Sequence, residues 1–336
     1  MSGLLDKQNR RSVPETTTLQ DIEQALDLVR KHLIRTPVVY SPEFSEASGN
    51  EVFFKLESFQ RTHAFKARGA LNQVAGLSKV ERERGVIAAS SGNHALGVAY
   101  ASALLGIDAR VVMPLLTPAI KIDLAKHYGA QVILHGETYD DALEHATQLA
   151  QEHDMALLPS FDDLKVIAGQ GTIALEVLEA LPDVDLFLAP IGGGGLVSGL
   201  AIALNEIEHP SELVGVEAEG AAGMLVSLEA GERVKLAHIK TIADGIAVQQ
   251  PGRLNFEFVR RYAPDVITVS DEHILAGMVR LLWDMRVVVE PAAAAAPAAL
   301  LFHERLHEKG LKVCCIISGG NVSRALLEQV IKGETR

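Results

Sequence analysis

The feature that most constrains the fold of this 336-residue chain is a regular alternation of short apolar segments with amphipathic, helix-like segments. Short β-rich segments separated by helices are typical of a parallel sheet covered on both faces. One series lies between residues 85 and 161, and a second runs from Gln170 to Ile317. The first series has its predicted strands at 86–89, 109–113, 131–134 and 156–158. We therefore predict an α/β protein with two lobes, each a twisted, mostly parallel sheet covered by helices.

The order of the two series predicts how the lobes divide the chain. We expect a large discontinuous domain, formed by residues 1–84 and 155–336, and a small mobile domain formed by residues 85–154. With 48% hydrophobic residues, the chain can bury a core in each. A capping box at Thr18 predicts an early helix, and the alanine-rich segment 291–301 suits a buried helix better than a linker.

Charge and cysteine content limit the partners that the chain can have. Its formal net charge of −12 argues against nucleic-acid binding, which needs clustered lysines and arginines. Cys314 and Cys315 are adjacent in a strand-like run, so they point to opposite faces and predict neither a disulfide framework nor a zinc site. No signal peptide or membrane-spanning run is visible. We expect a cytoplasmic protein that binds a small molecule and neither nucleic acid nor membrane.

Four consecutive glycines, Gly192, Gly193, Gly194 and Gly195, join an apolar strand-like run to the helix-like segment 200–207. Glycines at a helix start leave backbone N–H groups unshielded, and these donors and the helix dipole favour an anion such as phosphate. The loop matches neither the dinucleotide fingerprint nor the Walker loop, because the required acidic and lysine residues are missing. A glycine-rich turn without a ligand is the alternative.

Three further segments place reactive groups at ends of predicted elements. Lys66 follows Phe65 at a predicted helix start, where partial desolvation and nearby positive charge would lower its pKa and allow a Schiff base with an aldehyde. Residues 90–94, Ser-Ser-Gly-Asn-His, lie where a strand ends and a helix begins, the edge at which open α/β sheets bind ligands. Ser318 follows another strand and can offer a hydroxyl to an aromatic nitrogen. The alternatives are a solvated lysine and ordinary capping serines.

Together these segments resemble the serine/threonine dehydratase and serine racemase family, pyridoxal-phosphate enzymes of the tryptophan-synthase β-like fold. The matching motifs occur in the family's order and span about residues 18 to 327, nearly the whole chain. They are 65–70, 91–94, 166–172, 192–195, 215–217, 241–245, 290–291 and 318–321. The resemblance implies pyridoxal 5'-phosphate as the cofactor, bound by the large domain.

The resemblance also implies the residues that bind this cofactor. Lys66 matches the lysine that holds the cofactor through an imine and then removes the Cα proton, and Gly192–Gly195 match the phosphate cup. Phe65 matches the residue stacked beside the ring, Asn93 the partner of the ring hydroxyl, and Ser318 the hydroxyl at the pyridine nitrogen. Gly245 and Glu290 complete the implied cofactor-binding set. A serine cannot protonate that nitrogen as an aspartate would, which favours expulsion of a β-hydroxyl over transamination.

A second implied set binds and processes the substrate. Ser90, Ser91, Asn93 and His94 match the loop that holds the substrate carboxylate, and Ser91 also matches the family's second proton donor. The chain departs from the family at Ala64, where a serine is usual. Glu217 matches the glutamate of a metal site found in some relatives, but the second acidic position is a glycine, Gly223. We therefore expect no metal, and a solvated carboxylate at a strand end as the role of Glu217.

These expectations combine into one function with several alternatives. We expect a dehydratase (ammonia-lyase) that converts a β-hydroxy amino acid such as L-threonine or L-serine to a 2-oxo acid and ammonia. The alternatives within the family are an amino-acid racemase and a 3-hydroxyaspartate dehydratase. A β-replacement enzyme that uses sulfide, as in cysteine synthases of the same fold, is a further alternative. A non-catalytic pyridoxal-binding protein is the alternative of another class. The resemblance implies a homodimer or a higher homo-oligomer, and Trp283 is expected in the core or a subunit contact.

Overall fold

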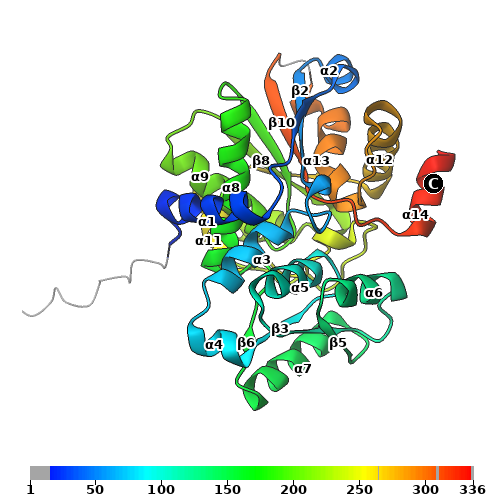
Figure 1. The fold of residues 1–336 in the computed structure, drawn as a ribbon. Coiled ribbons are helices and arrows are strands. Elements are labelled where there is room, and N and C mark those ends of the chain that lie inside the picture. The colour runs from blue at the N-terminus through cyan, green and yellow to red at the C-terminus, as the bar shows by residue number, and fades with distance from the viewer. Residues whose placement is uncertain (1–15, 264, 308–309, 334–336) are drawn as a thin grey trace, which may run out of the picture.

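The capping box predicted at Thr18 opens the first helix, α1 (Leu19–His32), because the Thr18 hydroxyl accepts from the Asp21 N–H while the Asp21 carboxylate accepts from the Thr18 N–H. This helix buries Ile22, Leu26 and Val29 on one face. The computed structural model describes residues 16–263, 265–307 and 310–333. It places them in two sheets with their covering helices, shown one above the other in Figure 1.

The large sheet has six strands in the order β1-β2-β10-β7-β8-β9. β1 pairs antiparallel with β2, and every other neighbour in the sheet is parallel. The predicted opposite orientation of Cys314 and Cys315 is confirmed, because the two side chains pack in different hydrophobic clusters. The strands are β1 (Val38–Tyr40), β2 (Glu51–Leu56), β7 (Leu186–Pro190), β8 (Glu212–Ala218), β9 (Val266–Val269) and β10 (Lys312–Ile317).

The small sheet has four parallel strands in the order β5-β4-β3-β6. Its last strand pairs with β3 and lies just past residue 154, where the sequence places the end of the small domain. The predicted two-lobed α/β fold is therefore present, with a small sheet that extends to residue 157. The strands are β3 (Val86–Ala89), β4 (Ala109–Met113), β5 (Gln131–Leu134) and β6 (Ala156–Leu157).

Helices cover both faces of the large sheet (Figure 1). One face packs against α2 (Pro42–Ser48), α12 (Asp271–Met285) and α13 (Pro291–Phe302). The other packs against α1, α8 (Leu164–Ala180), α9 (Gly195–Glu206) and α11 (Arg253–Tyr262). The alanine-rich segment forms the buried helix that was predicted for it, since all residues of α13 before Phe302 are buried. In contrast, Trp283 on α12 is 51% exposed and therefore lies outside the core.

The remaining helices lie beside the small sheet or at the molecular surface. They are α3 (Lys66–Ala75), α4 (Lys79–Arg84), α5 (Asn93–Leu105), α6 (Ala119–His127), α7 (Tyr139–Glu152), α10 (Gly223–Ala230) and α14 (Arg324–Lys332). Short 3-10 turns occur at η1 (Glu57–Phe59), η2 (Glu219–Ala221), η3 (Asp244–Ile246) and η4 (Glu304–Leu306). Among the described residues, no helix combines the length and hydropathy needed to span a membrane.

Strands of both sheets have their carboxyl ends at the same cavity. Ser90 follows β3, Ser318 follows β10, and Pro190 ends β7, and all three residues line the same cavity. Carboxyl ends of parallel strands are the edge at which α/β proteins bind ligands. The two sheets thus position one shared site between them.

Candidate active site

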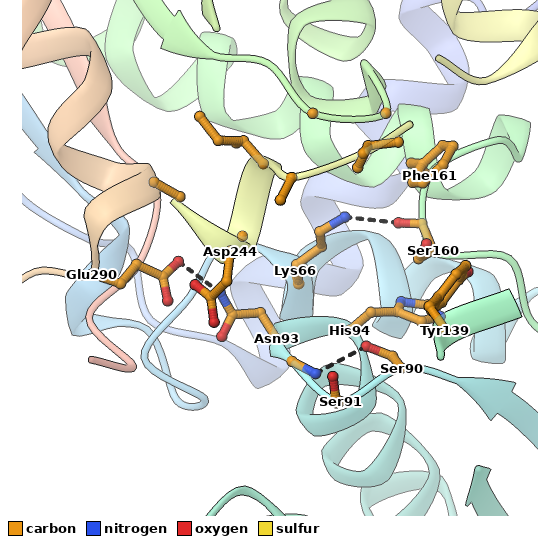
Figure 2. A pocket seen from close by; sticks show the side chains of 18 of the residues that line it. Lys66, Ser90, Ser91, Asn93, His94, Tyr139, Ser160, Phe161, Asp244 and Glu290 are labelled. Atoms are coloured by element: carbon orange, nitrogen blue, oxygen red, sulfur yellow. Dashed lines mark hydrogen bonds between the residues drawn. The ribbon is translucent and has the colours of Figure 1, made fainter. Parts of the chain in front are cut away.

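A cavity of about 810 Å³ lies between the two sheets. Every residue that the sequence marks as a site residue lines it, so the fold brings together segments that are far apart in the chain. Figure 2 shows many of these side chains pointing toward one another. The residues are Phe65, Lys66, Ser90, Ser91, Asn93, His94, Gly192, Gly193, Gly194, Gly195, Gly245, Glu290 and Ser318.

Lys66 is the first residue of α3, and its amine lies inside the cavity. The turn before it is fixed by the Phe65 N–H, which donates to the Ser318 carbonyl at 3.0 Å. The Lys66 Nζ donates to the Ser160 carbonyl at 2.9 Å and lies 5.3 Å from the Phe65 ring centroid (Figure 2). Its pKa is lowered to about 8 because burial disfavours the charged amine, while the negative charge of Glu290 opposes this change. The expected positive neighbour is therefore wrong as a cause, and desolvation alone lowers the pKa.

Asn93 and Glu290 form a hydrogen-bonded chain beside Lys66. The Asn93 amide donates to Glu290 Oε1 at 2.7 Å (Figure 2). The Asn93 side-chain carbonyl accepts from the Asn321 amide at 2.8 Å. Burial, together with the nearby charge of Asp244, raises the pKa of Glu290 to about 7. This carboxyl group therefore changes its charge near neutral pH, next to the lysine.

The serine-rich loop forms the N-terminus of α5. Ser90 Oγ accepts from the Gly92 N–H at 3.1 Å, and the Ser91 hydroxyl group points into the cavity (Figure 2). His94 Nε2 lies 3.0 Å from the Leu158 carbonyl, and burial together with the Lys66 charge lowers the His94 pKa to about 3. A neutral ring at this contact must carry its proton on Nε2 in order to donate to the carbonyl. The helix start and its hydroxyl groups therefore offer donors to an anion without a charged histidine.

The four-glycine loop is packed so tightly that side chains would not fit. A Cβ on Gly193 would lie 2.4 Å from the Phe161 ring, and one on Gly194, whose φ is +97°, would lie 2.8 Å from the Asn255 Cβ. The loop is also held in place, because the Asn255 amide donates to the Gly193 carbonyl at 2.9 Å. The N–H groups of Gly193 and Gly194 have no hydrogen-bond partner among the described residues. Buried donors at the start of α9 point to a missing anionic acceptor.

Ser318 and Gly245 close the cavity from the large sheet. Ser318 directly follows β10 and is 2% exposed. Gly245 lies in η3, where a Cβ would come within 2.9 Å of the Ala292 Cβ on α13. The small residues at this corner leave space beside the Lys66 amine.

Sequence reasoning missed further residues that line the cavity, among them Lys121, Tyr139, Ser160, Phe161 and Lys235. Ser160 and Phe161 follow β6 at the carboxyl edge of the small sheet, which was a usable signal. The two lysines carry no such signal, because their position depends on how the lobes meet.

Both of these lysines form ion pairs between segments attached to different sheets. Lys121 on α6 pairs with Asp244 in η3 at 2.8 Å. Lys235, in the segment after α10, pairs with Asp140 on α7 at 3.3 Å. The cavity mouth is therefore bridged twice by charge pairs.

Glu217 differs from its expected role as a solvated carboxylate at a strand end. It is 1% exposed, and its two oxygens accept from the N–H groups of Met224 and Leu225, each at 2.8 Å. It therefore caps the N-terminus of α10. No group of three or more histidine, cysteine or acidic side chains is positioned to hold a metal within the described part of the chain.

The sequence of this chain is similar to a family model and to proteins of known function. The family model described as "Pyridoxal-phosphate dependent enzyme" matches residues 29–319. The L-threonine ammonia-lyase of Thermotoga maritima is 42% identical over 314 residues, which cover 94% of this chain and 78% of the relative. The L-threo-3-hydroxyaspartate ammonia-lyase of Saccharomyces cerevisiae is 41% identical over 318 residues, covering 94% and 97%.

A solved structure shows the same arrangement in three dimensions. The structure of maize serine racemase superposes with a TM-score of 0.90 at 34% sequence identity. The match covers 95% of this chain and 98% of the maize chain. The same overall fold thus occurs in a relative of known structure.

Proposed function

Because this chain belongs to the family of pyridoxal-phosphate dependent enzymes, we propose that it is an ammonia-lyase that converts L-threonine to 2-oxobutanoate and ammonia. One observation carries the proposal. The Lys66 amine, with a lowered pKa, shares one cavity with the free N–H donors of the glycine loop and the donor-rich start of α5. An amine, a phosphate site and a carboxylate site are the three contacts that this cofactor and an amino acid require together.

The residues present fit the cofactor. The unpartnered N–H groups of Gly193 and Gly194 suit its phosphate, and the Lys66 amine suits its aldehyde. We assign the ring to the space between Phe65, Asn93 and Ser318, with Gly245 and Glu290 at its edge. When bound, pyridoxal phosphate draws electrons away from the Cα–H bond of the amino acid.

We assign the remaining steps to residues of this chain. The start of α5, with Ser90, Ser91, Asn93 and His94, holds the substrate carboxylate. Lys66, once released by the incoming amino group, takes the Cα proton. The hydroxyl group of Cβ then leaves with a proton as water, and a later water releases ammonia, so that no water is consumed overall. The Ser318 hydroxyl would hold the ring nitrogen of the bound cofactor by a hydrogen bond without transferring a proton to it, which would leave negative charge at Cα available for this expulsion.

The charges around the cavity favour a substrate without a second carboxylate. Among the described lining residues, the lysines are Lys66, Lys121 and Lys235, and there is no arginine. Lys121 and Lys235 are paired with aspartates, and His94 is neutral. A β-carboxylate would therefore be desolvated without a free cation. We propose threonine or serine as substrates in preference to 3-hydroxyaspartate.

Racemisation is a second candidate because Ser91 lines the same cavity as Lys66. A second acid on the other side of Cα would allow the proton to return with inverted configuration. Chiral chromatography after incubation with L-serine distinguishes the reactions, since Ser91→Ala should abolish any D-serine formed. If the unaltered enzyme forms no D-serine, the racemase proposal fails.

The main experiment measures 2-oxo acid formation from L-threonine, L-serine and L-threo-3-hydroxyaspartate. We expect the highest kcat/KM with threonine, and at least a thousandfold loss of kcat in Lys66→Ala, because the amine acts directly in the reaction. Lys79→Ala, whose side chain is 89% exposed, is the matched lysine control and should retain full activity. Absence of 2-oxo acid from all three substrates contradicts the proposal.

We also propose that residues 85–154 form a small domain that moves against the remainder, in a cytoplasmic homo-oligomer. The buried free thiols of Cys314 and Cys315 suit a reducing compartment. Trp283 and Val288 are 51% and 41% exposed, as expected at a subunit contact. Light scattering of the purified protein tests the oligomeric state, and a monomer contradicts it.

A further inference from the structure

Four charged side chains are buried together behind the active-site lysine. Lys55, Glu57 and Arg68 are each 0% exposed, and Glu176 is 1% exposed. None of them lines the cavity. The cluster joins β2, η1, α3 and α8, so it connects four elements around the start of α3.

Arg68 is the centre of this cluster and uses all five N–H donors of its guanidinium group. Nε and Nη2 donate to the two oxygens of Glu57, each at 2.8 Å. Nη1 and Nη2 donate to the two oxygens of Glu176 at 3.0 and 2.7 Å. The fifth bond runs from Nη1 to the Thr172 hydroxyl at 3.1 Å. Two planar, two-point contacts fix the guanidinium in position and in orientation.

The remaining members balance the charge. Lys55 Nζ donates to Glu176 Oε2 at 2.6 Å and to the Thr36 carbonyl at 2.7 Å. The Thr36 hydroxyl donates to Glu57. Two cations and two carboxylates therefore leave the cluster neutral. Buried ion pairs are often no more stabilising than apolar side chains of the same size, so stability alone does not account for this arrangement.

Arg68 lies opposite Lys66 on the same helical turn. Residues two positions apart are separated by about 200° around a helix axis, so the amine faces the cavity while the guanidinium faces away from it. The cluster therefore holds the start of α3 on the side that faces away from the cavity.

α8 connects this cluster to the glycine loop. It packs closely on α3, because a Cβ on Gly169 would lie 2.6 Å from the Gly69 Cα. It packs equally closely on α9, because a Cβ on Gly199 would lie 2.5 Å from the Gly171 nitrogen. α3 begins at Lys66 and α9 begins at Gly195. The position of α8 therefore sets the separation between the amine and the glycine loop.

We propose that Arg68 is a positioning residue that, through Glu57 and Glu176, holds the Lys66 amine at the distance from the glycine loop that one cofactor molecule spans. This inference rests on the cofactor contacts proposed above. Imine formation joins Lys66 Nζ to the aldehyde carbon of the cofactor, and the aldehyde oxygen leaves as water. Both ends of the cofactor must be held at once for this bond to be stable, so a small displacement of α3 weakens it.

The test compares two ligands on one variant. Both ligands can bind through the glycine loop and the ring contacts, but only pyridoxal phosphate can also bond to Lys66, because pyridoxine phosphate has no aldehyde. The variant Arg68→Met with Glu57→Gln removes one charge of each sign and leaves the pair between Lys55 and Glu176. We expect pyridoxine phosphate to bind within twofold of the unaltered protein by calorimetry. We expect pyridoxal phosphate to bind about tenfold or more weakly, with a reduced visible absorption of the imine.

Two further variants keep the result interpretable. If the double variant does not fold, Arg68→Lys takes its place in the test. This variant retains the charge without the two-point contacts, so it should show a smaller change in the same direction. Leu281→Ala creates a cavity in α12, away from the cluster, and should leave both affinities unchanged despite lower stability. Equal weakening of both ligands, or unchanged binding of both, overturns the proposal. If the unaltered protein forms no imine that Lys66→Ala abolishes, it is the proposed cofactor contact that fails, not the role of Arg68.

Discussion

The state of a single amine decides whether this site can react. Burial lowers the pKa of Lys66 to about 8, and Glu290 limits the change because its negative charge favours the protonated amine. Glu290 itself has a pKa raised to about 7, so it is charged mainly above neutrality. Two groups of opposite charge type therefore titrate next to each other near the working pH of most cells.

The rate at which the cofactor-free protein forms the imine should follow the neutral fraction of Lys66. Below about pH 8 the amine is protonated, so the rate should rise about tenfold per pH unit and level off above pH 8. Glu290→Gln removes the charge that favours the protonated amine, so the plateau should begin at lower pH. Stopped-flow absorbance measures both curves.

Glu219→Gln is the control for this profile, because Glu219 is exposed on η2, away from the cavity lining. Its curve should match that of the unaltered protein. A rate that does not change between pH 6 and pH 9 would show that Lys66 is already neutral or that another step limits the reaction.

At the scale of elements, helix starts carry much of the binding capacity of this fold. α3, α5 and α9 begin at the cavity, and α10 begins at a buried carboxylate instead. The two N–H donors of α10 are occupied by Glu217, whereas those of the glycine loop have no partner in the described residues. Whether a side chain already occupies the donors distinguishes a structural helix start from a ligand site.

Glu217 should make stability depend on pH. Burial raises its pKa to about 7 from an ordinary 4.5, so the folded state binds a proton more tightly than the unfolded state. Its contribution is greatest below pH 4.5 and is lost as pH rises through about 7. The free energy of unfolding of the unaltered protein, relative to Glu217→Gln, should therefore fall by about 1–3 kcal/mol between pH 5 and pH 8.

Chemical denaturation at the two pH values measures this difference, and the subtraction cancels the other titrating groups. Glu219→Gln again serves as control, with no pH-dependent difference from the unaltered protein. An equal difference between Glu217→Gln and the unaltered protein at both pH values would mean that the carboxyl group keeps its ordinary pKa.

The whole molecule is held across its cavity by two exposed ion pairs. Lys121 pairs with Asp244, and Lys235 pairs with Asp140, and each pair links an element of the small sheet to a segment of the large one. Exposed pairs contribute about 0.2–1 kcal/mol each and are screened by salt. Pairs of this strength would favour one position of the proposed mobile domain without fixing it there.

Removing both pairs should weaken substrate binding. In Lys121→Met with Lys235→Met, we expect KM for threonine to rise about two- to tenfold at low salt, because the closed arrangement loses two attractive contacts. The KM of the unaltered enzyme should rise with salt, while that of the variant should change little. Arg324→Met breaks an exposed pair confined to α14 and should behave as the unaltered enzyme. Identical salt dependence in both enzymes would contradict the prediction.

The fold followed from local signals in the sequence, and the cofactor followed from the family resemblance that its motifs carry. The glycine loop and the segment around Lys66 each combine an unusual residue with the start of an element, and the two-lobed α/β fold and the cofactor family are confirmed. Contacts between distant segments were not predictable. Ser160 and Phe161 reach Lys66 only because the two sheets meet, and the burial of Glu217 depends on where α10 packs. The five bonds of Arg68 likewise need three elements in place, η1, α3 and α8, and a single arginine in a sequence gives no sign of them.

The bond between the Lys66 amine and the Ser160 carbonyl joins the segments through which the chain enters and leaves the small sheet. Lys66 starts the helix that leads the chain toward the small sheet, and Ser160 lies just beyond β6, where the chain leaves that sheet again. The Lys66 amine is thus hydrogen-bonded to the segment about which the proposed mobile domain would rotate. We therefore expect that any rotation of the proposed mobile domain at this point changes the solvation of the amine, and with it the reactivity of Lys66.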